Sequence, residues 1–383
     1  MRVLLVVNTL PPQDLSGVGE QVVQLASGLR QLGVEVEILG RGQDGARGPK
    51  WLYPLTVVPA LGRSLEDFKP HVVQVHESDG GLAVCWLSLR MAQKKRPLLV
   101  ALQQVSYVEE GRAVRTLRWN GKRLERPGWR ELGFRYFKVP FHVLLGRWSV
   151  RGADLVLAPS ARTAEELVRD YGAAGVKVLP NTTSGPLASP EPVGAPLPGH
   201  GFLLFVGRLR LRKGLSVLLE ALRLLQTERG LALPLVVAGD GEQGAALRAA
   251  ARRLGISDSV TWLGRVSRGQ VRYLLERAAL LVVPSIYEGL PLVLLEALVM
   301  EVPVVASRVS GIPEVLERSG GGWLVDPEDP KALAEALAVA WQDPQERSAR
   351  ARRGQEFVRR ELAPRRVAAL WLEMVKPFVE EMP

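Results

Sequence analysis

The sequence predicts an α/β protein made of two doubly wound domains that face a cleft. Strand-like apolar runs alternate with helical patterns along most of the chain, a proline-rich stretch interrupts them, and the alternation then starts again. Such alternation is typical of a parallel sheet covered by helices on both faces. A length of 383 residues is too great for one compact core and suits two domains.

The first domain is predicted over residues 1–182. A helix is expected over 20–33, because its apolar residues recur at the helical period and Gly33 follows as a stop. A further helix is expected after "DLVLAPS", where Ser160 or Thr163 can cap it. The expected strands are 2–7, 34–39, 71–76, 97–105 and 154–160.

A linker is predicted over residues 183–200, where five prolines fall in a stretch with neither helical nor strand period. The second domain is predicted over 201–363, because strand runs such as "FLLFVG" and "LLVVPS" alternate there with helical segments. In doubly wound sheets, ligands bind beyond the carboxyl ends of the strands, which is where we look for the site.

Composition excludes several classes of protein. With 47% hydrophobic and 23% charged residues the chain is globular, and the single cysteine, Cys85, excludes an internal disulfide. No secretory signal is recognised at the N-terminus, and no apolar run reaches the ~20 residues needed to cross a bilayer. We expect a soluble, cytoplasmic protein.

The stretch "EGLPLVLLE" raises the question of what Glu288 and Glu296 do. A strand ends before it, and Pro291 suits the first position of a helix, whose free N–H groups favour a phosphate. Eight helical residues span ~12 Å, which disfavours the carboxylate pair of a glycosidase. The glutamates could instead accept hydrogen bonds from hydroxyls on either side of a phosphate. They could equally be a helix cap and a surface charge.

Two other segments follow predicted strands. "VGRLRLRKGL" places Arg208 and Lys213 where two cations suit a diphosphate, although a solvated basic turn is the simpler interpretation. "AGDGEQG" matches the dinucleotide pattern G-x-G-x-x-G over Gly239–Gly244, but no acidic residue for a ribose follows the next strand.

The N-terminal loop over residues 8–22 is also rich in glycine. Gly17 and Gly19 would leave room for a ligand beside the backbone. His76, at the end of a predicted strand, could line the cleft or serve as a structural residue. The four histidines form no metal-ligand set, and there is no D-x-D pair, so no metal is expected.

Together these segments resemble the retaining glycosyltransferases of family 4, the "glycosyl transferases group 1" set with the GT-B fold. The resemblance covers nearly the whole chain and is strongest over 202–330. It rests on an ordered series of pieces: "GRLRLRKG", "AGDGEQ", "VTWLGRV", "PSIYEGLPLVLLEAL", "VPVVASRVSGIPEVL" and "GWLVDPEDPKALAEAL".

The resemblance implies a metal-independent, cofactor-free enzyme that moves a sugar from a nucleoside-diphosphate sugar to a glycan or lipid-linked acceptor. Arg208 and Lys213 would bind the diphosphate, Glu288 the donor sugar and Glu296 the ribose. It also implies that the C-terminal segment 364–383 packs back on the first domain. The remaining implied donor-binding residues are Gly17, Gly19, Gln104, Gly207, Arg265, Val266, Gly289 and Leu290.

Two departures from the family pattern stand out. Gln104 replaces the expected histidine near the transferred sugar, and Pro180–Thr182 reads "PNT" in place of "PNG". Three other enzyme classes stay open: a nucleotide-sugar epimerase or a phosphorylase on the same fold, and an NAD-type oxidoreductase that uses Gly239–Gly244. A non-enzymatic binding module is a further alternative.

Residues 107–151 interleave cations with aromatic residues. Eleven Lys and Arg and only two Glu lie within 111–151, in a chain of net charge +10. The segment predicts either contact with an anionic membrane surface or a solvated basic face, with equal weight. Nucleic-acid binding is not expected, because no such motif is present.

Overall fold

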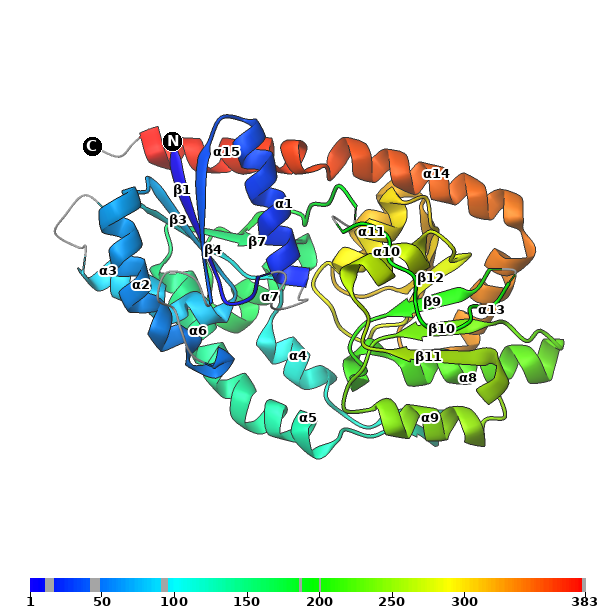
Figure 1. The fold of residues 1–383 in the computed structure, drawn as a ribbon. Helices are drawn as coiled ribbons and strands as arrows, with labels where there is room; N and C mark the ends of the chain where they lie inside the picture. The colour runs from blue at the N-terminus through cyan, green and yellow to red at the C-terminus, as the bar shows by residue number, and fades with distance from the viewer. Residues whose placement is uncertain (11–16, 42–48, 91–95, 186–187, 200, 381–383) are drawn as a thin grey trace. The chain divides into compact units, whose positions relative to one another are not determined.

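The computed structural model describes residues 1–10, 17–41, 49–90, 96–185, 188–199 and 201–380. The chain forms two compact units, which we describe one at a time (Figure 1). The first consists of residues 1–109, 137–183 and 361–383, and the second of residues 110–136 and 184–360. Among the described residues, no helix is long and apolar enough to cross a membrane.

The first unit is built on a six-stranded parallel sheet with the strand order β2-β1-β3-β4-β7-β8. Four of these strands, β1, β3, β4 and β7, are buried along almost their whole length, as expected for parallel strands covered on both faces, whereas the edge strand β2 exposes Glu35 and Glu37. The bounds are β1 (Arg2–Val7), β2 (Glu35–Gly40), β3 (Val72–His76), β4 (Leu98–Leu102), β7 (Leu155–Ala158) and the short β8 (Lys177–Val178).

Helices cover both faces of this sheet. On one face, Leu5 packs with α1 (Gly17–Gln31) and α15 (Pro364–Glu380). On the other, Leu4 packs with α2 (Tyr53–Phe68) and α3 (Gly81–Arg90). Successive side chains of β1 therefore point to opposite layers. The unit also contains α6 (Val139–Gly152), α7 (Ala161–Tyr171) and the first three residues of α4 (Tyr107–Ala113).

The second unit repeats the plan with the order β11-β10-β9-β12-β13-β14, again all parallel. Its strands are β9 (Leu203–Val206), β10 (Leu235–Ala238), β11 (Val260–Gly264), β12 (Leu280–Val283), β13 (Val304–Ser307) and β14 (Gly322–Val325). Its helices are α8 (Leu215–Arg229), α9 (Gly244–Arg253), α10 (Arg268–Leu275), α11 (Leu292–Val299), α12 (Ile312–Ser319), α13 (Pro330–Gln342) and α14 (Pro344–Glu361).

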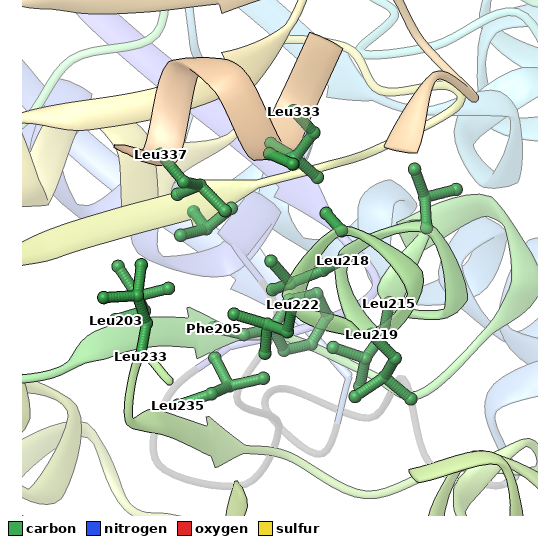
Figure 2. Close-up of a cluster of buried hydrophobic side chains, with 14 of the residues drawn as sticks. Leu203, Phe205, Leu215, Leu218, Leu219, Leu222, Leu233, Leu235, Leu333 and Leu337 are labelled. Atoms are coloured by element: carbon green, nitrogen blue, oxygen red, sulfur yellow. The ribbon is translucent and has the colours of Figure 1, made fainter. Parts of the chain in front are cut away.

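The largest described core of this unit lies between the sheet and helices α8 and α13. Leu218 and Leu222 of α8 meet Phe205 of β9, and Leu333 and Leu337 of α13 close the layer (Figure 2). All five side chains are buried, and each contributes about 1.5–3 kcal/mol through burial. This core holds the strand ends from which the site loops start.

Two of the passages of the chain between the units, at 109/110 and at 136/137, were not suggested by the sequence. Residues 110–136 belong to the second unit by their contacts, although the sequence placed them within a first domain over 1–182. The C-terminal helix α15 lies on α1, where Trp371 is fully buried. Segment 364–380 thus joins the first unit.

The segment 110–136 contains a two-stranded antiparallel hairpin, β5 (Leu117–Trp119) and β6 (Lys122–Glu125). Asn120 and Gly121 form its turn with φ of 46° and 75°, the left-handed backbone that the pair Asn-Gly adopts most readily. Trp119 and Leu124 pack against the core of the second unit. The hairpin is therefore docked by apolar contacts.

Glu125, at the end of this hairpin, is buried and carries an unusual pKa. Burial raises the pKa from 4.5 to about 7, the Ser216 hydroxyl opposes part of the rise, and the charge of Glu131 adds to it. Within the described chain, neither carboxylate oxygen makes a hydrogen bond of ordinary geometry, including one to Ser216. Docking of the hairpin therefore favours the neutral acid.

We predict that Glu125→Gln stabilises the protein at high pH only. The folded-state pKa exceeds the unfolded one, so the wild-type chain loses stability as pH rises from about 4.5 to about 7 and then levels off. The loss is on the order of 3 kcal/mol. Urea unfolding at pH 4 and pH 8 should show the variant equal to wild type at pH 4 and more stable at pH 8. Equal stability at both values would contradict the account.

Candidate functional site

The loop that follows β9, residues 207–214, is held on one side by the loop after β10. The amide of Gly207 donates to Ala238 (3.0 Å), and that of Leu209 donates to Asp240 (3.0 Å). A Cβ added to Gly241 would lie 2.5 Å from the Leu209 carbonyl oxygen, and one added to Gly239 would lie 1.8 Å from that of Gly207. These two glycines of G-x-G-x-x-G are thus required for the packing of two loops.

On its other side the loop is held by the segment after β12. The amide of Ile286 donates to the carbonyl of Arg212 at 2.8 Å. Gly214 has a left-handed backbone (φ 65°), and a Cβ there would lie 1.9 Å from the carbonyl oxygen of Pro284. The loop is therefore fixed between two neighbouring strand ends, and its side chains face the segment that carries Glu288.

Glu288 is buried and is surrounded by cations of this loop. Its Oε1 forms an ion pair with Lys213 Nζ and accepts a hydrogen bond from Ser285 Oγ at 2.8 Å. Its Oε2 accepts from the Arg212 guanidinium at 3.1 Å. The side chain does not cap α11, which begins four residues later with Pro291 as its N-cap. The helix-cap alternative for Glu288 is therefore wrong.

The charges of this cluster stabilise one another. Burial alone would raise the pKa of Glu288, but Lys213 and Arg212 outweigh it and hold that pKa below its usual value. Burial lowers the pKa of Lys213, with Arg212 adding to the effect and Glu288 opposing it. For Arg212, burial is outweighed by Glu110 and Glu288, so its pKa is raised. Glu288 is thus ionised at neutral pH.

Glu296, eight residues further on, is fully buried within α11 and pairs with Arg268 at the start of α10. The alternative that it is a surface charge is therefore wrong. Arg212 and Arg268 were not singled out from the sequence. Arg212 stands beside the predicted Lys213, and its position in a dense basic run was the only signal for it.

The other predicted residues of the second unit lie on the same strand-end loops. Arg208 is exposed at the start of the basic loop, while Arg265 is exposed and Val266 half-buried after β11. Gly289 and Leu290 are buried in the turn before α11, where the Gly289 carbonyl accepts from Gly311 N at 3.0 Å.

The predicted residues of the first unit have structural contacts of their own. Gly19 is buried, and a Cβ there would lie 2.3 Å from the Thr9 carbonyl oxygen. The close approach of α1 to the segment that follows β1 therefore already explains this glycine. Gly17 is exposed at the first position of α1. The intervening residues 11–16 of the predicted glycine-rich loop lie outside the described chain.

Gln104 is buried and forms a reciprocal amide pair with Asn181. Each side-chain NH₂ donates to the oxygen of the other amide at 2.9 Å. His76 is fully buried, and burial lowers its pKa to about 3, so it is neutral and structural. The described residues contain no group of acidic, histidine or cysteine side chains that would hold a metal ion.

Comparison with known proteins assigns the chain to a family. Residues 195–357 match the model of "Glycosyl transferases group 1", and residues 15–184 match "Glycosyltransferase Family 4". The chain is 31% identical over 369 residues to D-inositol 3-phosphate glycosyltransferase 2 of Catenulispora acidiphila, covering 85% of this chain and 82% of that protein. This protein therefore belongs to the group 1 glycosyltransferases. Matches to several other curated relatives span only 33% to 50% of their length.

Solved structures confirm the GT-B fold. Sucrose-phosphate synthase from Thermosynechococcus elongatus superposes with a TM-score of 0.76 at 19% identity and covers 99% of both chains. HepE from Anabaena, solved with UDP-glucose, superposes with a TM-score of 0.69 at 18% identity, over 98% of this chain and 100% of that one. At these identities the likeness concerns the fold alone.

The packing of Gly241 predicts opposite effects for two alanine substitutions in the same motif. Gly241→Ala places a methyl group against the backbone of Leu209 and should destabilise the protein by roughly 1–3 kcal/mol. Gly244→Ala meets only ordinary contacts of 3.4 Å or more at the start of α9, and should stabilise the helix by up to about 1 kcal/mol. Chemical denaturation measures both. Equal tolerance of the two substitutions would contradict the packing account.

Proposed function

We propose that this protein transfers a sugar from a nucleoside-diphosphate sugar to an acceptor hydroxyl, with retention of configuration and without a metal ion or other cofactor. The observation that carries the proposal is the buried Glu288, which is paired with Lys213 and Arg212 just ahead of helix α11. Cations and a helix N-terminus together favour a diphosphate, and a carboxylate among them can accept sugar hydroxyls.

The proposed roles follow the strand-end loops. Lys213 and Arg208 bind the diphosphate, whose charge replaces that of Glu288 as the partner of Lys213. Glu288, still paired with Arg212, accepts hydrogen bonds from the donor sugar, and Glu296 accepts from the ribose. The remaining predicted donor-binding residues keep their proposed roles: Gly207, Arg265, Val266, Gly289 and Leu290 in the second unit, and Gly17, Gly19 and Gln104 in the first.

The reaction itself requires charge stabilisation more than acid–base chemistry. The bond between the anomeric carbon and the diphosphate oxygen breaks, and a bond to the acceptor oxygen forms on the same face of the sugar. The acceptor proton passes to the departing phosphate. Lys213 and Arg208 stabilise the negative charge that develops there, and loss of one such donor costs about 3–4 kcal/mol.

One neighbouring structure supports the donor class, because HepE has been solved with UDP and with UDP-glucose. The relative from C. acidiphila is named as a D-inositol 3-phosphate glycosyltransferase, which supports sugar transfer as the reaction. The oxidoreductase alternative loses its main support, because Gly239 and Gly241 are accounted for by loop packing. No specific observation favours an epimerase or a phosphorylase.

We predict that Glu288→Gln lowers the rate of sugar transfer by at least about 10²-fold. The same substitution should leave the binding of a free nucleoside diphosphate intact, because Lys213 and Arg212 lose a competing anion. UDP-, GDP-, ADP- and dTDP-sugars are first screened by thermal shift, since ligand at 100 times its Kd stabilises the fold by about 2.7 kcal/mol. Glu335→Gln, exposed on α13, is the control for lost charge. Full transfer activity in Glu288→Gln would overturn the proposal.

We further propose that the acceptor is a glycan or lipid-linked molecule at the cytoplasmic face of a membrane, which the enzyme contacts through α6. Phe141, Leu144 and Trp148 recur on one face of this helix and are 40% to 49% exposed, and Phe137 just before it is 80% exposed. Residues 137–152 carry three cations and no acidic residue. An apolar stripe with basic neighbours suits an anionic bilayer surface.

This proposal limits the membrane-contacting surface to α6 and the residue Phe137 before it, within the segment predicted over 107–151. Trp119 is half-buried against the core of the second unit, and Tyr107 stacks on His142. We predict that the protein sediments with phosphatidylglycerol vesicles at low salt and not with phosphatidylcholine vesicles. Phe141→Ser with Trp148→Ser should abolish sedimentation, while Val168→Ser, an exposed apolar residue on α7, should not. Sedimentation that is equal in all three proteins would contradict the proposal.

A further inference from the structure

The segment 110–136 reaches the basic loop of the second unit, although its neighbours on both sides along the chain belong to the first unit. At the end of α5 (Trp129–Gly133) nearest the hairpin, the amide of Arg130 donates to Glu242 Oε1 at 3.0 Å. The side chain of Gln243 donates to the carbonyl of Arg126 at 3.0 Å. These bonds place α5 beside the loop that follows β10, which itself holds loop 207–214.

Glu131 joins these two loops through one carboxylate. Its Oε1 accepts a hydrogen bond from the backbone amide of Leu211 at 2.8 Å, and its Oε2 accepts from Gln243 Nε2 at 2.6 Å. The residue is only 5% exposed. A buried carboxylate with such partners fixes them firmly, because charge-assisted hydrogen bonds are stronger than neutral ones. Glu131 therefore anchors the backbone of the basic loop at its centre.

Glu110 acts on the side chain next along the loop. Its Oε1 lies 3.0 Å from Arg212 Nε, while the NH1 group of the same guanidinium lies 3.1 Å from Glu288 Oε2. Both carboxylates are buried. Arg212 is thus held between two glutamates, of which one belongs to the proposed donor site and the other to the segment 110–136.

The basic loop needs such counter-charges. It carries Arg208, Arg210, Arg212 and Lys213 within six residues, and like charges at this spacing repel one another. Burial lowers the pKa of Arg210, and the charges of Arg208 and Arg212 lower it further, while Glu110 and Glu131 oppose both effects. The two glutamates of the segment thus offset repulsion that would otherwise spread the loop.

We propose that Glu110 is a positioning residue for sugar transfer. By holding Arg212 at its Nε, it keeps the guanidinium from turning wholly onto Glu288, whose carboxylate then stays in place for the donor sugar. Glu131 supports this role by fixing the loop backbone. The inference rests on the proposed function, since it assigns Glu288 the contact with the sugar.

The geometry predicts a particular pattern of kinetic change for Glu110→Gln. The kcat for transfer should fall roughly tenfold, the size typical of residues that orient a catalytic group. The Kd of the nucleoside diphosphate should be unchanged or smaller, because the loop gains one net positive charge. A loss of fold alone would lower the active fraction and would not tighten binding of the diphosphate.

The experiment measures kcat for the best donor of the thermal-shift screen, and the Kd of the matching free nucleoside diphosphate by calorimetry. Glu109→Gln is the matched control, because Glu109 is the preceding residue and pairs with Arg169 of α7. The double variant Glu110→Gln/Arg212→Gln should be no slower than Arg212→Gln alone if Glu110 acts through Arg212.

Each outcome decides one point. A wild-type protein that binds no nucleoside diphosphate overturns the proposed function and this inference with it. A wild-type protein that binds and transfers, beside a Glu110→Gln variant that behaves as Glu109→Gln does, overturns the positioning role alone. Additive losses in the double variant also overturn it, because Glu110 would then act independently of Arg212.

Discussion

The fixed backbone of loop 207–214 is the constraint on which the site depends. Hydrogen bonds and close backbone contacts join the loop to two neighbouring strand ends, at Asp240 on one side and at Ile286 on the other. Four cations follow one another on so short a loop only because the backbone cannot spread and because carboxylates face it from three places. The site is therefore organised before any ligand arrives, which is the condition for strong electrostatic stabilisation of a transition state.

The same constraint explains how the buried Glu288 and its partners Lys213 and Arg212 can lie close together without a large cost in stability. An isolated buried carboxylate is very costly, and removing one partner of a buried pair typically costs 3–5 kcal/mol. Glu288 has two cationic partners, so a ligand that draws Lys213 away leaves Arg212 in place. Exchange of one partner is then possible without exposing an uncompensated charge. In the proposed donor site, Arg212 would thus keep Glu288 available to a ligand as well as stable without one.

The sequence predicted the regular parts of the fold well and the irregular parts poorly. Buried parallel strands such as β1 and β12 are continuous apolar runs, and their period is visible in the residues themselves. The helix α2 was not predicted, because Pro54 and Pro59 interrupt its pattern, although the first falls in its first turn and the second is accommodated within it. The hairpin β5–β6 was also missed, although its Asn120–Gly121 turn was a usable signal.

The site residues divide in the same way: some could be predicted from local sequence, and others are identified only by their contacts in the folded structure. Three site residues stood out in the sequence because each follows a predicted strand within a short stretch of chain: Lys213, Glu288 and Glu296. Arg268 and Glu110 did not, because their roles come from neighbours 28 and 102 positions away along the chain, at Glu296 and Arg212 respectively. No spacing rule reaches so far, and only the packed structure brings such pairs together.

The two departures from the family pattern meet within the first unit. Gln104 pairs with Asn181, and the hydroxyl of Thr182 donates to the Leu362 carbonyl at 2.8 Å, just before α15. Both residues thus carry structural bonds. The Gln104 amide still has a second hydrogen and a second lone pair for a sugar hydroxyl, but it cannot carry a proton and cannot turn without breaking two hydrogen bonds. Glu288 differs, because in the proposed donor site its ionic partners would yield to a competing charge. We therefore expect position 104 to offer a fixed, neutral contact, so that the two departures bear on which sugar is recognised and leave the proposed charge chemistry to the basic loop.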